Sequence, residues 1–356
     1  MPFDLATLGW DDARAAELTH VETTHTRELT PARVSRVDRG ALTVLTAEGQ
    51  LRVRASGRLF RSHIEEDADP TGTPAVGDWV ALDGPVAVAV LPRRSVFERG
   101  APSGESVSQV VAANVDTVFI VAPLVGRPRP RVVQRCLALA WQSGATPVVL
   151  LTKKDLCADV ENRLATARAD AVGVEVHAVS ATTGEGLADL QPYLSPGQTI
   201  AMIGPSGAGK STLTNALGDG EFTLATGAIR DDGKGRHTTT ARELVILPSG
   251  AIAIDTPGLR GLALWDAAEG IAAAFSDIEE FAGDCRFADC RHDSEPGCAV
   301  ARAIDEGDLT AARLDDYNKL LREQRRLASR RDSRIRAQDR AKAKTFFKSL
   351  RGQPHR

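Results

Sequence analysis

A nine-residue stretch near the middle of the chain has the composition of a phosphate-binding loop. It follows the apolar run Thr199–Ile203, precedes helix-forming residues, and fits the pattern GxxxxGK[ST]. Glycines let backbone N–H groups curve around phosphate oxygens, and the N-terminus of the following helix adds positive charge. Lys210 would reach the β- and γ-phosphates, and the Ser211 hydroxyl would ligate Mg²⁺. The alternative is a glycine-rich turn without a ligand. The predicted phosphate site comprises Gly204, Pro205, Ser206, Gly207, Ala208, Gly209, Lys210, Ser211 and Thr212.

The loop alone does not identify the base, because the same residues would suit an ABC-type ATPase. The chain has no segment like LSGGQ, however, which argues against that class. Residues 152–155, Thr-Lys-Lys-Asp, have the form [NT]KxD and follow the apolar run 147–151. The Asp155 carboxylate could accept hydrogen bonds from N1–H and the 2-amino group of guanine, and adenine offers neither donor in that arrangement.

The remaining parts of the expected base site lie close by. The Lys153 stem could lie along the face of the base. Ser180 and Ala181 follow the apolar run 174–179 and resemble the short loop whose backbone N–H faces the guanine carbonyl. A TKKD tetrapeptide is common on protein surfaces. Here each element follows a predicted strand, where ligands bind in open α/β sheets. The predicted base site comprises Thr152, Lys153, Lys154, Asp155, Ser180 and Ala181.

Two further motifs could contact Mg²⁺ and the γ-phosphate. Residues 255–258, Asp-Thr-Pro-Gly, match DxxG: Asp255 would hold a water on Mg²⁺, and the Gly258 N–H would bind the γ-phosphate. Residues 235–240, Gly-Arg-His-Thr-Thr-Thr, lie in a polar, glycine-rich stretch that could order around the γ-phosphate. We choose Thr239 as the Mg²⁺ ligand, and Thr238 and Thr240 are alternative ligands. The alternative for the whole segment is a hairpin turn without a ligand.

The residue after DxxG bears on catalysis. Leu259 stands near the place where Ras-like enzymes have a glutamine that orients the attacking water, and leucine cannot make that hydrogen bond. His237 is the best candidate to position the water instead. A structural histidine, or one that contacts RNA, is an equal alternative. The sequence therefore predicts slow intrinsic turnover.

A compact cluster of soft ligands follows the nucleotide motifs. Three thiolates and one imidazole fall within 14 positions, and four such ligands suit a closed tetrahedral structural Zn²⁺ site. Pro296 and Gly297 fit a tight return of the chain. The alternative is three buried cysteines and a chance histidine. No Cys-x-x-Cys pair supports a redox role. The predicted zinc ligands are Cys285, Cys290, His292 and Cys298.

The sequence pattern divides the elements that must position these residues into two kinds. Before residue 100, five short alternating segments separated by turns predict a small β-barrel, most simply an OB-fold. After residue 105, near-continuous apolar strands alternate with helices, which is typical of a mainly parallel, doubly wound sheet covered on both faces. The expected barrel strands lie near 32–37, 41–46, 50–55, 76–82 and 86–91, and the later strands near 116–122, 147–151, 174–179, 199–203, 243–247 and 251–254.

The composition argues against a membrane protein and a secreted protein. The 356 residues are 42% hydrophobic and 26% charged, with no apolar run near the ~18 residues that a membrane helix needs. The acidic N-terminus and five cysteines favour a reducing cytosol. Residues 311–356 hold 15 Lys and Arg against 5 Asp and Glu, a net +10; the whole chain carries −3, so residues 1–310 carry −13. The basic end predicts a polyanion contact.

The order of the motifs is informative. Ordinary small GTPases run phosphate loop, switch threonine, DxxG, [NT]KxD and then SA, whereas here [NT]KxD and SA come first. The chain thus has the order of a circularly permuted GTPase. From residues 77–80, Gly-Asp-Trp-Val, to the cysteine cluster it resembles the circularly permuted ribosome small subunit-dependent GTPase A family, also called RsgA, YjeQ or YloQ. Thr152 departs from the asparagine that is commoner in such GTPases. Threonine has a hydroxyl but lacks the amide, so we expect weaker binding of guanine.

That resemblance implies a multidomain α/β protein with an OB-fold barrel, a permuted P-loop GTPase domain and a helical zinc domain. It implies Mg²⁺-dependent GTP hydrolysis stimulated by the small ribosomal subunit during late maturation, with GTP, GDP and rRNA as partners. It also identifies His237 with the histidine of the family's GRHTTT motif. We expect a cytoplasmic monomer that does not enter membranes. The expected divisions are 1–30 as a lead-in, 31–103 as an OB-fold barrel that binds RNA, 104–265 as the circularly permuted GTPase domain and 266–356 as the zinc domain with its basic tail.

Two other classes stay open on the sequence alone. One is a P-loop ATPase or small-molecule kinase with a merely stabilising zinc element. The other is an RNA-binding adaptor whose nucleotide site is regulatory and hardly turns over.

Overall fold

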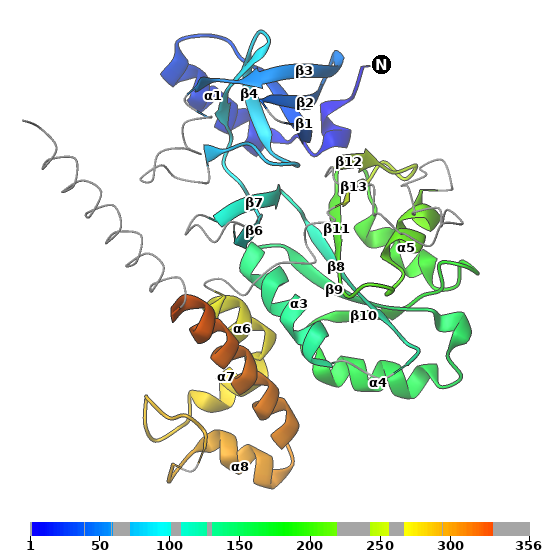
Figure 1. Ribbon diagram of the computed structural model, residues 1–356, viewed down its shortest axis with the longest axis vertical. Helices are drawn as coiled ribbons and strands as arrows, with labels where there is room; N and C mark the ends of the chain where they lie inside the picture. The colour runs from blue at the N-terminus through cyan, green and yellow to red at the C-terminus, as the bar shows by residue number, and fades with distance from the viewer. Residues whose placement is uncertain are drawn as a thin grey trace, which may run out of the picture.

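The computed structural model describes residues 2–38, 40–57, 59, 72–100, 108–126, 130–218, 243–255, 267–293 and 295–329. Figure 1 shows a barrel of blue strands above an α/β unit, with a group of yellow and orange helices below and to one side. No helix within these ranges is long and apolar enough to cross a bilayer.

The N-terminal strands close into a five-stranded barrel. Antiparallel pairs join β1 to β2, β2 to β3, β4 to β5 and β1 to β4, and the parallel pair β3–β5 completes the ring. Alternating apolar side chains fill the interior, including Val34, Val44, Val53 and Val80. This confirms the expected OB-like barrel. Its strands are β1 Thr30–Asp38, β2 Ala41–Thr46, β3 Gly49–Ala55, β4 Trp79–Asp83 and β5 Val86–Val90.

The first thirty residues, expected as a lead-in, contain two helical elements. A 3-10 turn η1 (Leu5–Leu8) precedes α1 (Asp12–His25), which begins at an Asp11 side chain that caps the Arg14 N–H. Leu8 and Leu18 are buried against the body of the protein. The helix presents few apolar residues, so no 3.6-residue period reveals it in the sequence. What anchors it is the buried arginine Arg14.

The permuted domain contains the expected parallel sheet. Its strand order is β10-β9-β8-β11-β13-β12, with all neighbours parallel except β12, which runs antiparallel to β13. The strands are β8 Thr117–Pro123, β9 Thr146–Thr152, β10 Glu175–Ala178, β11 Thr199–Ile203, β12 Glu243–Ile246 and β13 Ile252–Asp255. These bounds agree with the apolar runs of the sequence, because buried parallel strands are apolar on both faces.

Helices cover both faces of this sheet. Val118 and Ile120 of β8 point to the core shared with α3 (Pro130–Ser143), whereas Phe119 and Val121 point to the core shared with α5 (Lys210–Leu217). The period-two alternation therefore divides one strand between two cores. Short helices complete the layers: α4 Val160–Asp170, η3 Lys154–Leu156 and η4 Leu187–Tyr193.

The barrel and the parallel sheet are joined edge to edge. Strand β1 pairs with β12 at Arg36 and Glu243, so that eleven strands form one continuous sheet. A separate hairpin of β6 (Val96–Gly100) and β7 (Ser108–Ala113) links the two units along the chain. The sequence patterns predict neither feature.

Gly77 sits at the seam between barrel and sheet. Its φ is +91°, and a Cβ there would lie 2.1 Å from the Ala113 carbonyl oxygen. Gly77→Ala should therefore lower the unfolding temperature by at least about 6 °C. Gly84 is the matched control: its φ is +55° and nothing lies within 4 Å, so Gly84→Ala should cost less than about 4 °C. Equal shifts in a thermal melt would show that the close approach is unimportant.

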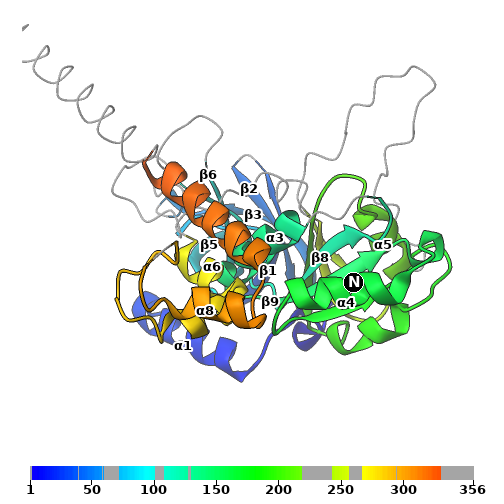
Figure 2. The same cartoon turned by 90° about the horizontal axis from the view of Figure 1, so that it is seen from below.

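The C-terminal helices are joined to α3 through α6 and the last helix. They are α6 Ala268–Ala274, α7 Ser276–Ala282, α8 Ala299–Glu306 and a helix over 311–329, which both ribbon views place beside α6 and α8 (Figures 1 and 2). Arg313 is buried and binds Asp277 of α7 at 2.5 and 2.8 Å. Ion pairs Arg131–Asp316 and Arg135–Glu323 tie α3 to the last helix. The cysteine-bearing module is therefore fixed to the α/β unit.

Candidate nucleotide and metal sites

The motifs predicted from the sequence meet at one edge of the sheet. TKKD begins at Thr152, the last residue of β9. Ser180 follows β10, the glycine-rich loop follows β11, and Asp255 is the last residue of β13. Because these strands are parallel, their carboxyl ends lie on the same side, where open α/β sheets bind ligands.

The glycine-rich loop turns sharply from β11 into α5. Gly204, Gly207 and Gly209 have positive φ angles of 141°, 77° and 94°, conformations that favour glycine. Gly204 has a second requirement, because a Cβ there would lie 2.1 Å from the Val121 carbonyl oxygen of β8. Lys210 Nζ lies over the loop, donating to the carbonyl oxygens of Gly204 at 2.8 Å and Pro205 at 2.7 Å. The loop thus has the curvature that a phosphate cradle needs.

The base motif contacts this loop directly. The Thr152 hydroxyl donates to the Ala208 carbonyl oxygen at 2.5 Å, and both residues are buried. A Cβ on Gly209 would lie 3.6 Å from the same hydroxyl oxygen, which is ordinary contact. The threonine hydroxyl therefore links the base motif to the phosphate loop. Residues 56 positions apart along the chain are hydrogen-bonded at the candidate site.

The base motif also contacts the SA loop. Lys154 N donates to the Val179 carbonyl oxygen at 3.2 Å, and Lys154 Nζ pairs with Glu185 at 2.7 Å. The Glu185 carbonyl oxygen in turn accepts from Ser180 N at 2.8 Å. Glu185 is a residue that the sequence analysis missed, since nothing in its local pattern reveals a partner 31 positions earlier. These contacts hold the three loops together.

The positions of the other predicted residues vary. Lys153 has a φ of 62° and precedes η3, and Asp155 is exposed within η3. Ser206, Ser211 and Thr212 are exposed. The predictions for His237, Thr238, Thr239, Thr240, Gly258 and Leu259 lie outside the described residues, and Asp255 is described only as the end of β13.

The cysteine cluster forms a second candidate site. One ligand atom from each of Cys285, Cys290, His292 and Cys298 lies within 4.8 Å of the others. The Cys285 and Cys298 sulfurs are 3.9 Å apart, and His292 Nδ1 is 3.6 and 3.5 Å from them. A tetrahedral centre with bonds of about 2.3 Å to sulfur needs sulfurs about 3.8 Å apart. The cluster therefore fits a metal ion held by four protein ligands.

The backbone around the cluster brings the ligands together and hydrogen-bonds the Cys285 thiol. His292 has a φ of 60° and Gly297 a φ of 80°, so two tight turns bring the ligands together. Burial acts to raise the pKa of the Cys285 thiol, but hydrogen bonds from the backbone at Val300 and Ala299 and from the thiols of Cys290 and Cys298 together lower that pKa. A lower pKa favours the thiolate, which is the form that binds metal.

Comparison with known proteins extends these observations. Residues 90–265 match the family model described as RsgA GTPase. The crystal structure of YjeQ from Thermotoga maritima superposes with a TM-score of 0.62 at 25% identity, over 83% of this chain and 99% of that one. YloQ, described as a circularly permuted GTPase, superposes with a TM-score of 0.60 at 25% identity, over 85% and 96%. The expected permuted fold is thereby confirmed.

Curated relatives match over nearly the whole length. A protein of Streptomyces avermitilis named "Small ribosomal subunit biogenesis GTPase RsgA" is 45% identical over 98% of this chain and 95% of its own length. The protein of the same name from Streptomyces coelicolor is 46% identical over 96% and 92%. At this identity over nearly the whole length, the chain belongs to the RsgA GTPase family.

Proposed function

We propose that this protein hydrolyses GTP to GDP and phosphate during late maturation of the small ribosomal subunit, whose binding stimulates it. The single observation that supports the nucleotide chemistry best is the Thr152–Ala208 hydrogen bond, which joins the guanine motif to the phosphate loop. One nucleotide can then contact both. The small-subunit partner comes from the names of the full-length relatives.

The residues divide the work by chemistry. Lys210 neutralises charge on the β- and γ-phosphates, and Asp155 selects guanine through two accepted hydrogen bonds. Ser211, Thr239 and Asp255 are the Mg²⁺ residues, with Asp255 acting through a water, and the Gly258 N–H holds the γ-phosphate. His237 positions the attacking water in place of a glutamine. Bound Mg²⁺ supplies neutralisation of developing negative charge.

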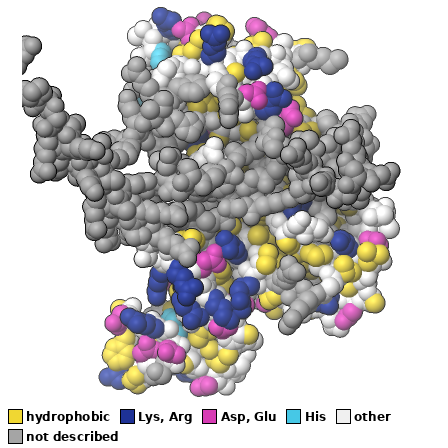
Figure 3. Space-filling view, in the orientation of Figure 1, with side chains coloured by type: hydrophobic (Ala, Val, Ile, Leu, Met, Phe, Trp, Pro, Cys, Tyr) yellow, Lys and Arg dark blue, Asp and Glu magenta, His cyan; other side chains and the backbone are white. Residues whose placement is uncertain are grey.

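The proposed contact with ribosomal RNA rests on charge and position. Figure 3 shows Lys and Arg side chains gathered over the lower half of the molecule, where the helix over 311–329 lies. Its members Arg322, Arg325 and Arg326 are all exposed. A face of this kind binds phosphates without reading sequence. We place the protein in the cytoplasm as a monomer, with the domain divisions 1–30, 31–103, 104–265 and 266–356.

The metal at the cysteine cluster is proposed to be one structural Zn²⁺. Three thiolates and an imidazole are the ligands that zinc prefers, and four of them leave no position for a substrate. The ion would join the turn before α8 to the segment after α7, which short helices alone hold weakly.

Cys285→Ser should weaken zinc binding by at least about 100-fold, because a hydroxyl replaces one of four thiolates. Zinc content per chain, measured by mass spectrometry after dialysis against a chelator, reports the loss. Cys157→Ser is the matched control, since Cys157 lies outside the cluster and should keep one equivalent. A Cys285→Ser protein that retains full zinc would exclude this ligand set.

GTP turnover measured with purified small ribosomal subunits, with large subunits and with neither tests the function. Small subunits should raise the single-turnover rate at least about tenfold, and large subunits should not, because ordering of a catalytic loop by a partner is a recognised route to faster hydrolysis. A rate that stays unmeasurable with small subunits would favour an RNA-binding adaptor. Equal stimulation by both subunits would contradict a small-subunit partner.

A further inference from the structure

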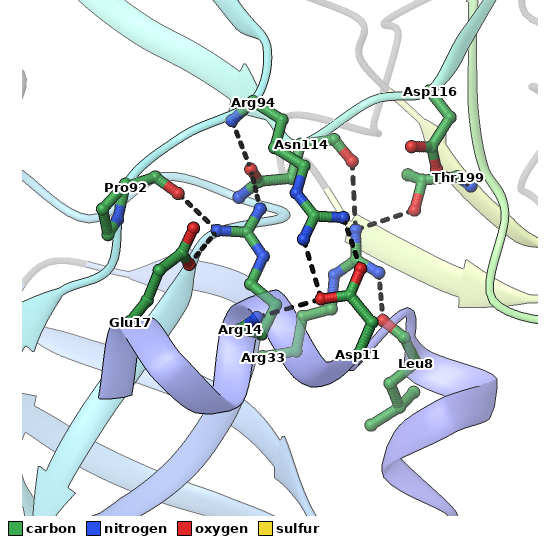
Figure 4. Close-up of polar contacts among 10 residues, drawn as sticks. All are labelled: Leu8, Asp11, Arg14, Glu17, Arg33, Pro92, Arg94, Asn114, Asp116 and Thr199. Carbon is green, nitrogen blue, oxygen red and sulfur yellow. Dashed lines mark hydrogen bonds and ion pairs between the residues drawn. The ribbon is translucent and has the colours of Figure 1, made fainter. Parts of the chain in front are cut away.

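A buried arginine joins the barrel to the α/β unit. Arg33 of β1 is 2% exposed, and its guanidinium donates to the backbone oxygens of Leu8 and Asn114 and to the Thr199 hydroxyl, the last at 2.7 Å. The same group lies 5.7 Å from the ring centre of Trp79. Figure 4 shows these contacts converging from η1, from the segment between β7 and β8, and from β11.

Stability alone does not explain this arginine. Among the described residues no carboxylate oxygen lies within 4 Å of its nitrogens, and its Nε has no hydrogen-bond partner. Burial lowers the pKa of Arg33 to about 10, so the group is still charged at neutral pH. Burying a charge costs free energy, and hydrogen bonds to neutral groups offset only part of that cost. What such charges can provide instead is a fixed register between parts.

The partners of Arg33 are themselves held in place. Asn114, with a φ of 55°, donates to the Gly77 carbonyl oxygen at 3.1 Å and accepts from Arg14 at 2.7 Å. Thr199 is fixed on its other side, where its N–H donates to an Asp116 carboxylate oxygen at 2.7 Å. Arg33 therefore binds rigid groups on both units.

The neighbouring cavity does not point to a small anion. It measures about 210 Å³ and is lined by Arg14, Arg33 and Arg94, but also by the carboxylates of Asp11 and Asp116. Arg94 is already bound by both Asp11 oxygens, at 2.7 and 2.8 Å. Charges that line this cavity therefore pair with one another at the contact between the barrel and the α/β unit.

Strand β1 contacts the nucleotide-binding framework at two places. Arg33 reaches Thr199, the first residue of β11, whose other end leads into Gly204. Three residues later, Arg36 pairs with Glu243 of β12, and Glu243 pairs with Asp255 of β13. The barrel is thus connected to the strands that end at the phosphate loop and at DxxG.

We propose that Arg33 is a positioning residue that fixes the orientation of the barrel on the GTPase domain, so that small-subunit binding to the barrel reaches the nucleotide site through β1. This inference rests on the proposed function and on the expectation that the OB-fold barrel, as well as the basic helix over 311–329, contacts the small subunit. Intrinsic hydrolysis uses residues at the opposite ends of the strands and does not need the joint. The stimulated rate does need it.

Two variants and a control test this role. Arg33→Met removes the charge, and Thr199→Val removes only the hydroxyl that accepts from it. Thr199→Ser keeps that hydroxyl and should behave as the original protein. Thr117→Val makes the same change at the first residue of the neighbouring strand β8, and Thr117 is not a partner of Arg33. For each protein, intrinsic turnover, small-subunit-stimulated turnover and unfolding temperature are measured.

Arg33→Met and Thr199→Val should each reduce the ratio of stimulated to intrinsic turnover at least about tenfold, the effect of one lost hydrogen bond to a charged group. Intrinsic turnover should stay within about twofold. If both variants are stimulated normally, or lose intrinsic and stimulated turnover equally, the positioning role is overturned. If Arg33→Met does not fold, Thr199→Val decides alone. If the original protein is not stimulated, the proposed function has failed instead.

Discussion

Lys210→Met should slow GTP hydrolysis by at least about 100-fold while the protein stays folded. Removing one group that stabilises charge in a transition state commonly costs a factor of 100 to 1,000, on the order of 3 to 4 kcal/mol. Lys210 begins α5, and its Nζ already lies over the loop within 2.8 Å of two loop carbonyl oxygens. Phosphate oxygens bound in the loop would lie within reach of the same ammonium group.

Single-turnover hydrolysis with the protein in excess measures this effect without interference from product release. Lys319→Met is the matched control, because Lys319 pairs with Asp315 on the helix over 311–329, away from the loop. The control should hydrolyse GTP at the original rate. A Lys210→Met protein that retains more than about a tenth of the rate would mean that another group carries the charge.

Asp155→Asn should change the nucleotide preference of the protein from guanine to xanthine. The carboxylate accepts from guanine N1–H and the 2-amino group, whereas an asparagine amide can donate to the 2-carbonyl of xanthine. Leaving polar groups unpaired in such a site costs a factor of 100 or more in selectivity. We expect the affinity for GDP to fall at least about 100-fold and the affinity for XDP to rise. Asp155 is exposed, so the fold should not change.

Fluorescent GDP and XDP analogues give both affinities in one format. Asp159→Asn provides the control: Asp159 is a nearby exposed aspartate at the start of α4, and asparagine is an equally good residue there. Its nucleotide preference should be unchanged. If Asp155→Asn still binds GDP as tightly as the original protein, the base is recognised elsewhere.

Local patterns predict most of the architecture. The apolar runs of β8, β9 and β11 are visible because a parallel strand is buried on both faces, and the alternation in β3 is visible because one of its faces is exposed. Helix α1 is not visible, since its buried residues are one arginine and one leucine and they form no apolar stripe. The β1–β12 pairing is not visible either. A single pair of residues joins elements more than 200 positions apart, and neither strand has a pattern that names its partner.

The sites show the same division. The phosphate loop and the cysteine cluster are predictable because their chemistry lies within a few consecutive turns of chain. The contacts that these motifs make with residues far away in the sequence are not predictable. The Thr152–Ala208 bond was expected only as a general convergence at strand ends, and the Lys154–Glu185 pair was not expected at all. Arg33 and Thr199 are 166 positions apart, and no motif contains either of them.

A single guanine nucleotide bound by TKKD and the phosphate loop together is tested most directly by calorimetric titration of the original protein with GDP and with ADP. The contact between Thr152 and Ala208 predicts one site in which the phosphate loop holds the diphosphate while Asp155 selects the base. GDP should bind at least about 100-fold more tightly than ADP, at one equivalent per chain. Equal affinities for the two nucleotides would contradict it.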